Sequence, residues 1–140
     1  MGVIYSATQT STANSSSADS VSLKCVNASF AVREFTVAGL GTASAANEVQ
    51  AARNTGGTVT TDMLPLNSQG PATSVTKFGV AQATTVTTTL YRFGVNANGA
   101  LFRWVAAPGL GMEVQTTGQW GLRGVSGTSN LVTAVIIEQF

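Results

Sequence analysis

The stretch TTVTTTLYRFGVNANGALFRWVA, residues 84–106, contains the two clearest strand patterns of the chain. Threonine, valine and aromatic residues favour extended backbone, so we expect strands at Thr84–Val95 and at Leu101–Ala106. The turn Asn96–Gly99 between them tolerates positive φ and suits a hairpin that pairs these two strands. The stretch therefore predicts a protein built from sheets.

Outward from this stretch, short strand patterns recur between Gly, Asn and Pro signals. Further strands are expected over residues 20–27, 30–38, 74–81, 112–117, 121–124 and 131–140. Ala45–Arg53 fits either a strand or a short helix, because its alanines favour helix. Met63–Asn67 and the following Gly70-Pro71 predict a long loop or edge segment. The pattern favours an all-β fold, an antiparallel jelly roll or β-sandwich of about eight strands.

Alternation within the strands predicts which side chains face the core. In Ser20–Asn27, Val21, Leu23 and Cys25 share one face. In residues 30–38, the face of Ala31, Arg33, Phe35 and Val37 is expected to be opposite to that of Phe30 and Val32. The last strand is apolar on both faces, with Leu131, Val135 and Ile137 on one side and Val132, Ala134, Ile136 and Phe140 on the other. Such a strand is either central and covered twice, or half-buried by a partner.

The N-terminal residues predict an extended arm. Thr10–Ser20 (TSTANSSSADS) has no large apolar side chain, so it cannot order itself by burial. Val3, Ile4 and Tyr5 are β-formers ahead of it, and we expect them to pair with a sheet edge of this subunit or of a neighbour. The predicted organisation is an arm over residues 1–20 and a domain over residues 21–140.

The composition offers little chemistry. The chain has no His, one Cys, 9% charged residues and a net charge of +1. Histidine is the commonest general base, and a basic surface is what attracts nucleic acid or anionic membranes. We therefore expect no enzyme, no cofactor or metal, and neither nucleic acid nor membrane as a partner. A small hydrolase that uses a pair of carboxylates stays open as an alternative.

Arginines next to aromatic residues mark the candidate binding residues. Trp, Tyr and Arg dominate the energy of protein interfaces, so Phe102, Arg103, Trp104 and Trp120 are candidate contacts, together with Val3, Ile4 and Tyr5 of the arm. A tryptophan can also stack on a sugar. Trp104 or Trp120 would then be the platform of a carbohydrate-binding module, such as that of a phage tail fibre or spike.

The order of these features resembles a known family. The run Asn47–Thr58 (NEVQAARNTGGT), the loop Leu64–Asn67, a Thr-rich strand, the segment Trp104–Pro108 and the closing strand with Glu138 follow one another as in the small jelly-roll cement, or decoration, proteins of tailed bacteriophage heads. The resemblance covers residues 20–140. It implies that Glu48–Arg53 is a strand.

The resemblance also implies a function. Cement proteins bind the outside of an assembled capsid and bridge neighbouring major capsid subunits, so that the shell resists internal pressure. The expected partners are the major capsid protein and further copies of the chain, as a homodimer or homotrimer. The expected location is the outer surface of a virion assembled in the host cytoplasm, and the family offers no catalytic residues to transfer.

Overall fold

The computed structural model describes residues 2–140, and the side chains of all of these except residues 8–10 and 74–75. The described residues form an antiparallel sheet of eleven strands. The strands are β1 (Val3–Ala13), β2 (Asp19–Cys25), β3 (Phe30–Leu40), β4 (Ala46–Thr55), β5 (Thr61–Pro65), β6 (Thr73–Gln82), β7 (Thr85–Asn96), β8 (Asn98–Val105), β9 (Met112–Val114), β10 (Gln119–Ser126) and β11 (Asn130–Gln139). The prediction of an all-β antiparallel fold is confirmed, and Ala46–Thr55 is a strand. The finer prediction, a jelly-roll sandwich of about eight strands, is not confirmed, because the strands form one nearly closed sheet.

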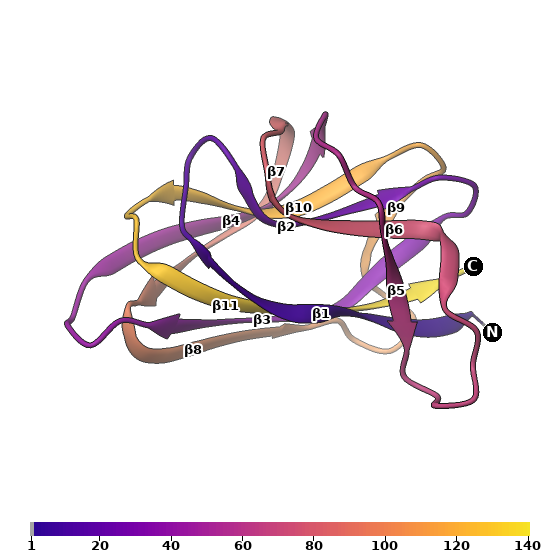
Figure 1. Ribbon diagram of the computed structural model, residues 1–140, viewed down its shortest axis with the longest axis horizontal. Helices are drawn as coiled ribbons and strands as arrows, with labels where there is room; N and C mark the ends of the chain where they lie inside the picture. The colour runs from indigo at the N-terminus through magenta and orange to yellow at the C-terminus, as the bar shows by residue number, and fades with distance from the viewer. Residues whose placement is uncertain (1) are drawn as a thin grey trace.

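The sheet folds over on itself into two layers (Figure 1). Its strand order is β7-β4-β10-β2-β6-β5-β1-β11-β3-β8, and β9 pairs with the end of β3. The upper layer in Figure 1 contains β7, β4, β10, β2 and β6, and the lower layer contains β1, β11, β3 and β8. The short strand β5, expected as a loop or edge segment, pairs with β6 and with β1 and so joins the layers on one side.

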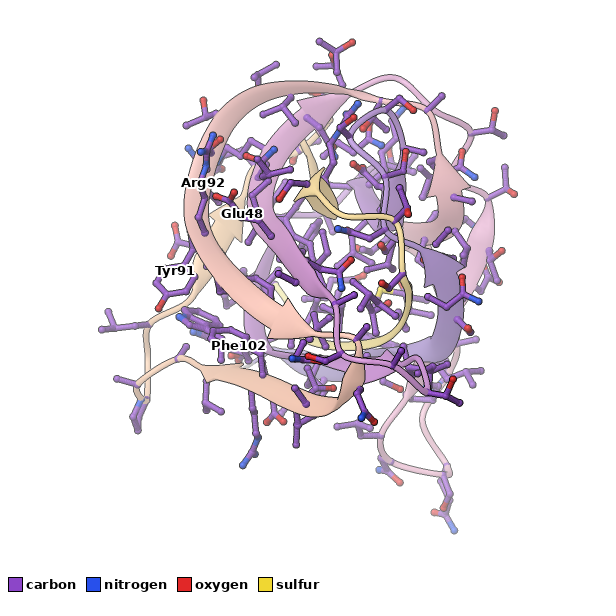
Figure 2. The ribbon with its side chains drawn as sticks, turned by 90° about the vertical axis from the view of Figure 1, so that its left-hand side faces the viewer. Glu48, Tyr91, Arg92 and Phe102 are labelled. Carbon is purple, nitrogen blue, oxygen red and sulfur yellow. The ribbon has the colours of Figure 1, made fainter. Side chains whose placement is uncertain are left out.

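Aromatic side chains close the opposite side, where β7 and β8 are the two ends of the sheet. The rings of Phe93 on β7 and Phe102 on β8 stack with centroids 4.0 Å apart, and Tyr91 lies 6.1 Å from Phe102. Figure 2 shows Tyr91 and Phe102 on this side of the molecule. Side-chain packing therefore replaces backbone pairing between these two strands.

The predicted hairpin of β7 and β8 is wrong. These strands follow one another in the chain, yet β7 pairs with β4 and β8 pairs with β3. The polar groups of the turn explain this, since Ala97 N donates to Ala45 O (2.8 Å) and Gly41 N donates to Ala97 O (2.6 Å). The turn is thus bonded to the segment between β3 and β4 and carries the chain from one layer to the other.

The core fills the space between the layers. Val21, Leu23 and Cys25 of β2 face it as predicted, and each is at most 1% exposed. Trp120 of β10 is completely buried, with its ring 5.8 Å from that of Phe35 and its Nε1 donating to the sulfur of Met112. Large side chains from both layers therefore interlock across the interior.

A β-bulge in β3 overturns the predicted alternation of that strand. Ile136 of β11 pairs with Glu34, but the next residue, Ile137, pairs with Val32, so Arg33 is an extra residue. An extra residue changes which face the following side chains occupy. Val32 before the bulge and Phe35 after it consequently both point into the core, where neither is exposed.

Val3–Tyr5 pairs with a strand of the same subunit, as predicted, but the strand continues through residues 10–13, which were expected to belong to an unpaired arm. β1 pairs with β11 from Val3–Gln139 to Ala13–Asn130, and the predicted boundary between residues 20 and 21 falls inside β2. The polar composition of 10–13 does not prevent pairing, because a ladder satisfies backbone groups whatever the side chains are. Met1, the first residue of the predicted arm, lies outside the described residues.

Tyr5 provides a test of whether β1 is an integral strand. Its side chain is 3% exposed, whereas that of its neighbour Ile4 is 45% exposed. We expect Tyr5→Ala to lower the free energy of unfolding by about 3–5 kcal/mol, as for other buried aromatic residues. Ile4→Ala is the matched control and should change it by less than about 0.5 kcal/mol. Urea unfolding of both variants measures this, and equal, small effects would show that β1 does not contribute to the stability of the sheet.

Candidate protein-binding surface

The outer surface of the lower layer is an open face formed by β5, β1, β11, β3 and β8. Residues paired across antiparallel strands point to the same side of a sheet, so the registers identify its members. They are Leu64 on β5, Ser6 and Ser11 on β1, Val132, Ala134 and Ile136 on β11, Glu34, Thr36 and Ala38 on β3, and Leu101, Arg103 and Val105 on β8. We call this set the β11 face.

The β11 face is apolar and open to solvent. Leu101, Val105 and Leu64 are 68%, 53% and 53% exposed, while Val132 and Ile136 at its centre are half-buried by the neighbouring strands. Among the strands of residues 2–140, β11 is in contact mainly with its neighbours β1 and β3 and, across the core, with β2, so no second layer of strands is packed over it on this side. Within the described residues β11 is central in its layer and packs on the core with one face, so it is not covered twice, and burial of the other face by a partner stays a prediction.

Two ion pairs provide the charge on this side of the sheet: Arg33 with Glu138 at the end of β11, where Glu138 is paired with Ile4, and Arg103 with Glu34, which lies within the β11 face. Arg103 donates from Nε and from Nη2 to the two carboxylate oxygens of Glu34, at 2.8 and 3.0 Å. These hydrogen bonds hold the pKa of Glu34 below its ordinary value. Each pair neutralises itself, so the face carries no net charge that would attract or repel a partner at long range.

The outer surface of the upper layer is different, because the chain covers it with its own loops. Asp19 at the start of β2 is completely buried there, and its Oδ2 accepts hydrogen bonds from Ser22 and Asn54. Arg123 donates to Ser16 O and to Thr84 O, which ties two connecting loops to β10. The chain's own loops therefore cover this part of the upper layer.

Close packing at Gly121 helps to explain how a carboxylate is buried there. A Cβ on Gly121 would lie 2.4 Å from Oδ2 of Asp19, so only glycine leaves room for this side chain. The other carboxylate oxygen, Oδ1, lies 3.9 Å from Nη1 of Arg123. Burial raises the pKa of Asp19, and the hydrogen bonds and the nearby guanidinium oppose that effect without cancelling it.

The structure separates the predicted interface residues into two groups. Tyr5 and Trp120 were predicted as interface residues, but both are core side chains, 3% and 0% exposed, and cannot contact a partner in this fold. Phe102 and Trp104 are half-buried and point inward from β8, next to Phe35. Arg103 alone lies on the β11 face, while Ile4 is exposed on the same side of β1 and Val3 at its end.

Sequence reasoning missed Leu101 and Val105, although the signal for them was present. Along a strand, side chains alternate between faces, so residues 101, 103 and 105 share one face and residues 102 and 104 the other. Arg103 is a charged residue and indicates which of the two faces is outside. Reading the aromatic residues as contacts obscured this pattern.

The two tryptophans considered as a platform for a sugar differ in exposure, since Trp104 is half-buried and Trp120 is not exposed. Trp120 is buried, and the ring of Trp104 is stacked on that of Phe35 with centroids 5.4 Å apart and planes at 15°. The carboxylates of Glu34, Asp62 and Glu138 are in ion pairs with basic side chains. Among residues 2–140 there is no group of three or more metal-ligating side chains, and no helix that could cross a membrane.

The raised pKa of Asp19 predicts an unusual pH dependence. The folded protein keeps this proton at pH values where the unfolded chain has lost it, so the free energy of unfolding falls as the pH rises from 3.8 through the folded-state pKa. Asp19→Asn keeps an acceptor for Ser22 and Asn54 but cannot ionise. We expect the variant to lose this part of the decline, in urea titrations from about pH 4 to about pH 8. The exposed-carboxylate variant Asp62→Asn is the control. A pH profile of Asp19→Asn that is parallel to the wild type would contradict the assignment.

Comparison with known proteins does not assign the chain to a family. No family model matches it, and no curated protein matches it either. The resemblance to cement proteins therefore stays a prediction from the order of the sequence features.

Proposed function

We propose that this chain is a structural protein that binds an assembled protein shell through the β11 face. In this proposal it is a capsid cement protein of a tailed bacteriophage. It binds the outside of the head and bridges neighbouring major capsid subunits. It is not an enzyme, and it uses no cofactor.

The observation that carries the proposal is the contrast between the two outer surfaces. One surface is covered in part by loops of the chain, which are hydrogen-bonded to the strands around Asp19 and Arg123. The other, the β11 face, is left uncovered although Leu101 and Val105 are more than half exposed. Burying apolar area is favourable by about 25 cal/mol per Å², and contiguous exposed apolar patches mark interaction sites.

The chemistry of the β11 face suits a protein partner. Its polar members are the hydroxyls of Ser6, Ser11 and Thr36, and both ion pairs on this side, Arg103 with Glu34 and Arg33 with Glu138, are internal to the chain. Such a face is neutral and offers neither the positive charge that nucleic acid requires nor a cluster of ligating side chains. It fits another neutral, flat surface, where shape and apolar contact supply the affinity.

The mechanism in this proposal is mass action. A ligand that binds only the assembled state stabilises that state in proportion to the logarithm of its free concentration over its dissociation constant. A protein that contacts two neighbouring shell subunits binds the assembled shell and not the free subunit. The exposed residues Val3 and Ile4 at the end of β1 lie beside the β11 face and would extend the contact.

Several finer statements belong to this proposal. The expected partners are the major capsid protein and a second or third copy of the chain, and the expected location is the outer surface of the virion after assembly in the host cytoplasm. We also propose that the fold is related to the jelly rolls of cement proteins. The eleven-stranded, nearly closed sheet offers the two exposed strands β7 and β8 as edges for self-association.

A charge placed on the β11 face tests the proposal. Leu101 is 68% exposed, so Leu101→Glu should leave the fold intact while it introduces an unpaired charge into a buried contact. We expect its affinity for assembled shells of the cognate major capsid protein to fall by about tenfold or more, measured by co-sedimentation. Melting temperature confirms that the variant is folded.

Val26→Glu is the matched control, because Val26 is 40% exposed but lies after β2, away from the β11 face. It should bind shells like the wild type. If Leu101→Glu and Val26→Glu both bind normally, the shell contact lies elsewhere. If the wild-type protein fails to bind assembled shells at all, the proposed function is wrong.

A further inference from the structure

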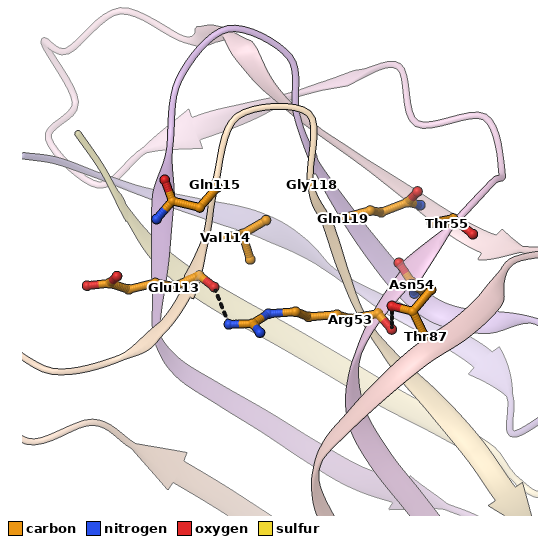
Figure 3. A pocket seen from close by; sticks show the side chains of 9 residues that line it. All are labelled: Arg53, Asn54, Thr55, Thr87, Glu113, Val114, Gln115, Gly118 and Gln119. Carbon is orange, nitrogen blue, oxygen red and sulfur yellow. Dashed lines mark hydrogen bonds between the residues drawn. The ribbon is translucent and has the colours of Figure 1, made fainter.

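Strands β7 and β8 are the two ends of the sheet, and their free edges differ in regularity. β7 pairs with β4 in a register that shifts twice, so Leu90 and Thr87 are extra residues that face no residue of β4. At the second shift, Thr87 donates from its Oγ1 to the backbone oxygen of Arg53 at 3.1 Å (Figure 3). Bulges interrupt the ladder of an edge strand and protect it against pairing with another chain. The edge of β7 is therefore unsuited to the addition of a further strand.

The edge of β8 is regular. Residues 101–105 of β8 pair with residues 34–38 of β3 without a register shift, and they include no proline. Their one charged residue, Arg103, points outward to the β11 face. β7 approaches β8 through the ring of Phe102, which points inward and lies 6.1 Å from that of Tyr91 (Figure 2). No strand within residues 2–140 pairs with the free side of β8, so its edge stays open.

Alternate residues of β8 direct their backbone polar groups to this open side. Ala106 N donates to Arg33 O at 2.8 Å, which identifies these two residues as a hydrogen-bonded pair. In an antiparallel ladder, such pairs alternate with pairs whose backbone groups point away from each other. Followed along the register, the N–H and C=O groups of Val105, Arg103 and Leu101 point away from β3. The side chains of these residues are all more than half exposed, so another strand can reach this edge.

We propose that two copies of the chain pair through β8, antiparallel and about a two-fold axis at Arg103. Arg103 then lies opposite Arg103 of the second copy, and Leu101 of each copy lies opposite Val105 of the other. Each of these pairs exchanges two backbone hydrogen bonds, and the Leu–Val pairs add apolar contact across the strands. The edge is thus complementary to itself, as a two-fold interface requires.

The position of the axis follows from the length of the regular edge. A shift by one residue in either direction would leave Leu101 or Val105 opposite a residue outside 101–105. Like charges directly opposite each other disfavour pairing. However, Glu34 accepts from the guanidinium of Arg103 at 2.8 and 3.0 Å, so each copy brings a neutral ion pair to the axis rather than a free positive charge.

This pairing would extend the lower layer from one copy into the next. Residues paired across antiparallel strands point to the same side of the sheet, so the β11 faces of the two copies form one continuous surface. Such a surface suits a contact with two neighbouring shell subunits. That role rests on the proposed function, whereas the dimer itself forms without a shell and is tested without one.

Sedimentation of the full chain at several concentrations, in the absence of shells, tests the pairing. The wild type should sediment as a dimer that dissociates on dilution. Arg103→Pro removes an outward N–H at an edge position where proline is tolerated, and we expect the dissociation constant of the dimer to rise by about tenfold or more. Arg92→Pro is the matched control on the edge of β7, where the arginine also has a glutamate partner, and it should sediment like the wild type.

Circular dichroism verifies the fold of both variants. A wild type that remains monomeric at about 1 mM overturns the inference, since such a dimer would have no useful affinity. Equal dimerisation of folded Arg103→Pro and folded Arg92→Pro overturns it as well.

Cysteine cross-linking tests the register and does not depend on the proline variants. The Cα atoms of a hydrogen-bonded antiparallel pair lie about 5.5 Å apart, a distance that a disulfide spans. Leu101→Cys and Val105→Cys chains should therefore form a disulfide-linked dimer when they are mixed and oxidised. Neither should do so alone, because two copies of the same position lie about 14 Å apart. The native Cys25 is buried and does not compete. If the mixture gives no linked dimer, or if each variant links to itself as readily, the proposed pairing is wrong.

Discussion

Strand β11 is apolar on both faces, and it has strands paired on both sides. Its inner residues Leu131, Val135 and Ile137 are completely buried in the core. Its outer residues lie at the centre of a face on which the chain places no covering layer. A strand of this kind fixes the lower layer through its pairing with β1 and β3, and it leaves apolar area that only another molecule can bury.

The two outer surfaces show how the chain distributes its polarity. Over the upper layer, loops are bonded to the strands by Arg123 and by the buried carboxylate of Asp19. On the outer side of the lower layer, Arg103 pairs with Glu34 and Arg33 pairs with Glu138, and the other members of the β11 face are apolar or hydroxylic. With 9% charged residues in the whole chain, few charges are available to make the second surface hydrophilic. A protein with these surfaces is suited to contact another protein on one side and solvent on the other.

Much of the fold could be predicted from the sequence, because strand formation depends on local patterns. The pairing could not, since it depends on contacts between distant residues. The turn at Ala97 has the residues of a hairpin, but its backbone bonds to Ala45 and Gly41 send β8 to another layer. The bulge at Arg33 changes which side chains of β3 face the core on either side of it. The alternation of apolar and polar residues in the sequence does not reveal where such a bulge lies. The low-complexity appearance of residues 10–13 concealed a strand, because the partner that pairs with it lies at the other end of the chain.

For the candidate surface, the sequence pointed to residues of β1, β8 and β10, and the structure turns the aromatic ones among them inward. Phe102, Trp104 and Trp120 are large aromatic residues, and such residues are common both in interfaces and in cores. Their inward direction follows from the registers with β3 and β2, which only the structure supplies.

Electron cryomicroscopy of assembled shells carrying the protein tests most directly whether the β11 face is the contact. A map of the decorated shell at side-chain resolution should place Val132, Ile136 and Leu101 against the shell subunits, with the loops around Asp19 and Arg123 directed to solvent. The opposite orientation, with the β11 face directed to solvent and those loops on the shell, would contradict the claim.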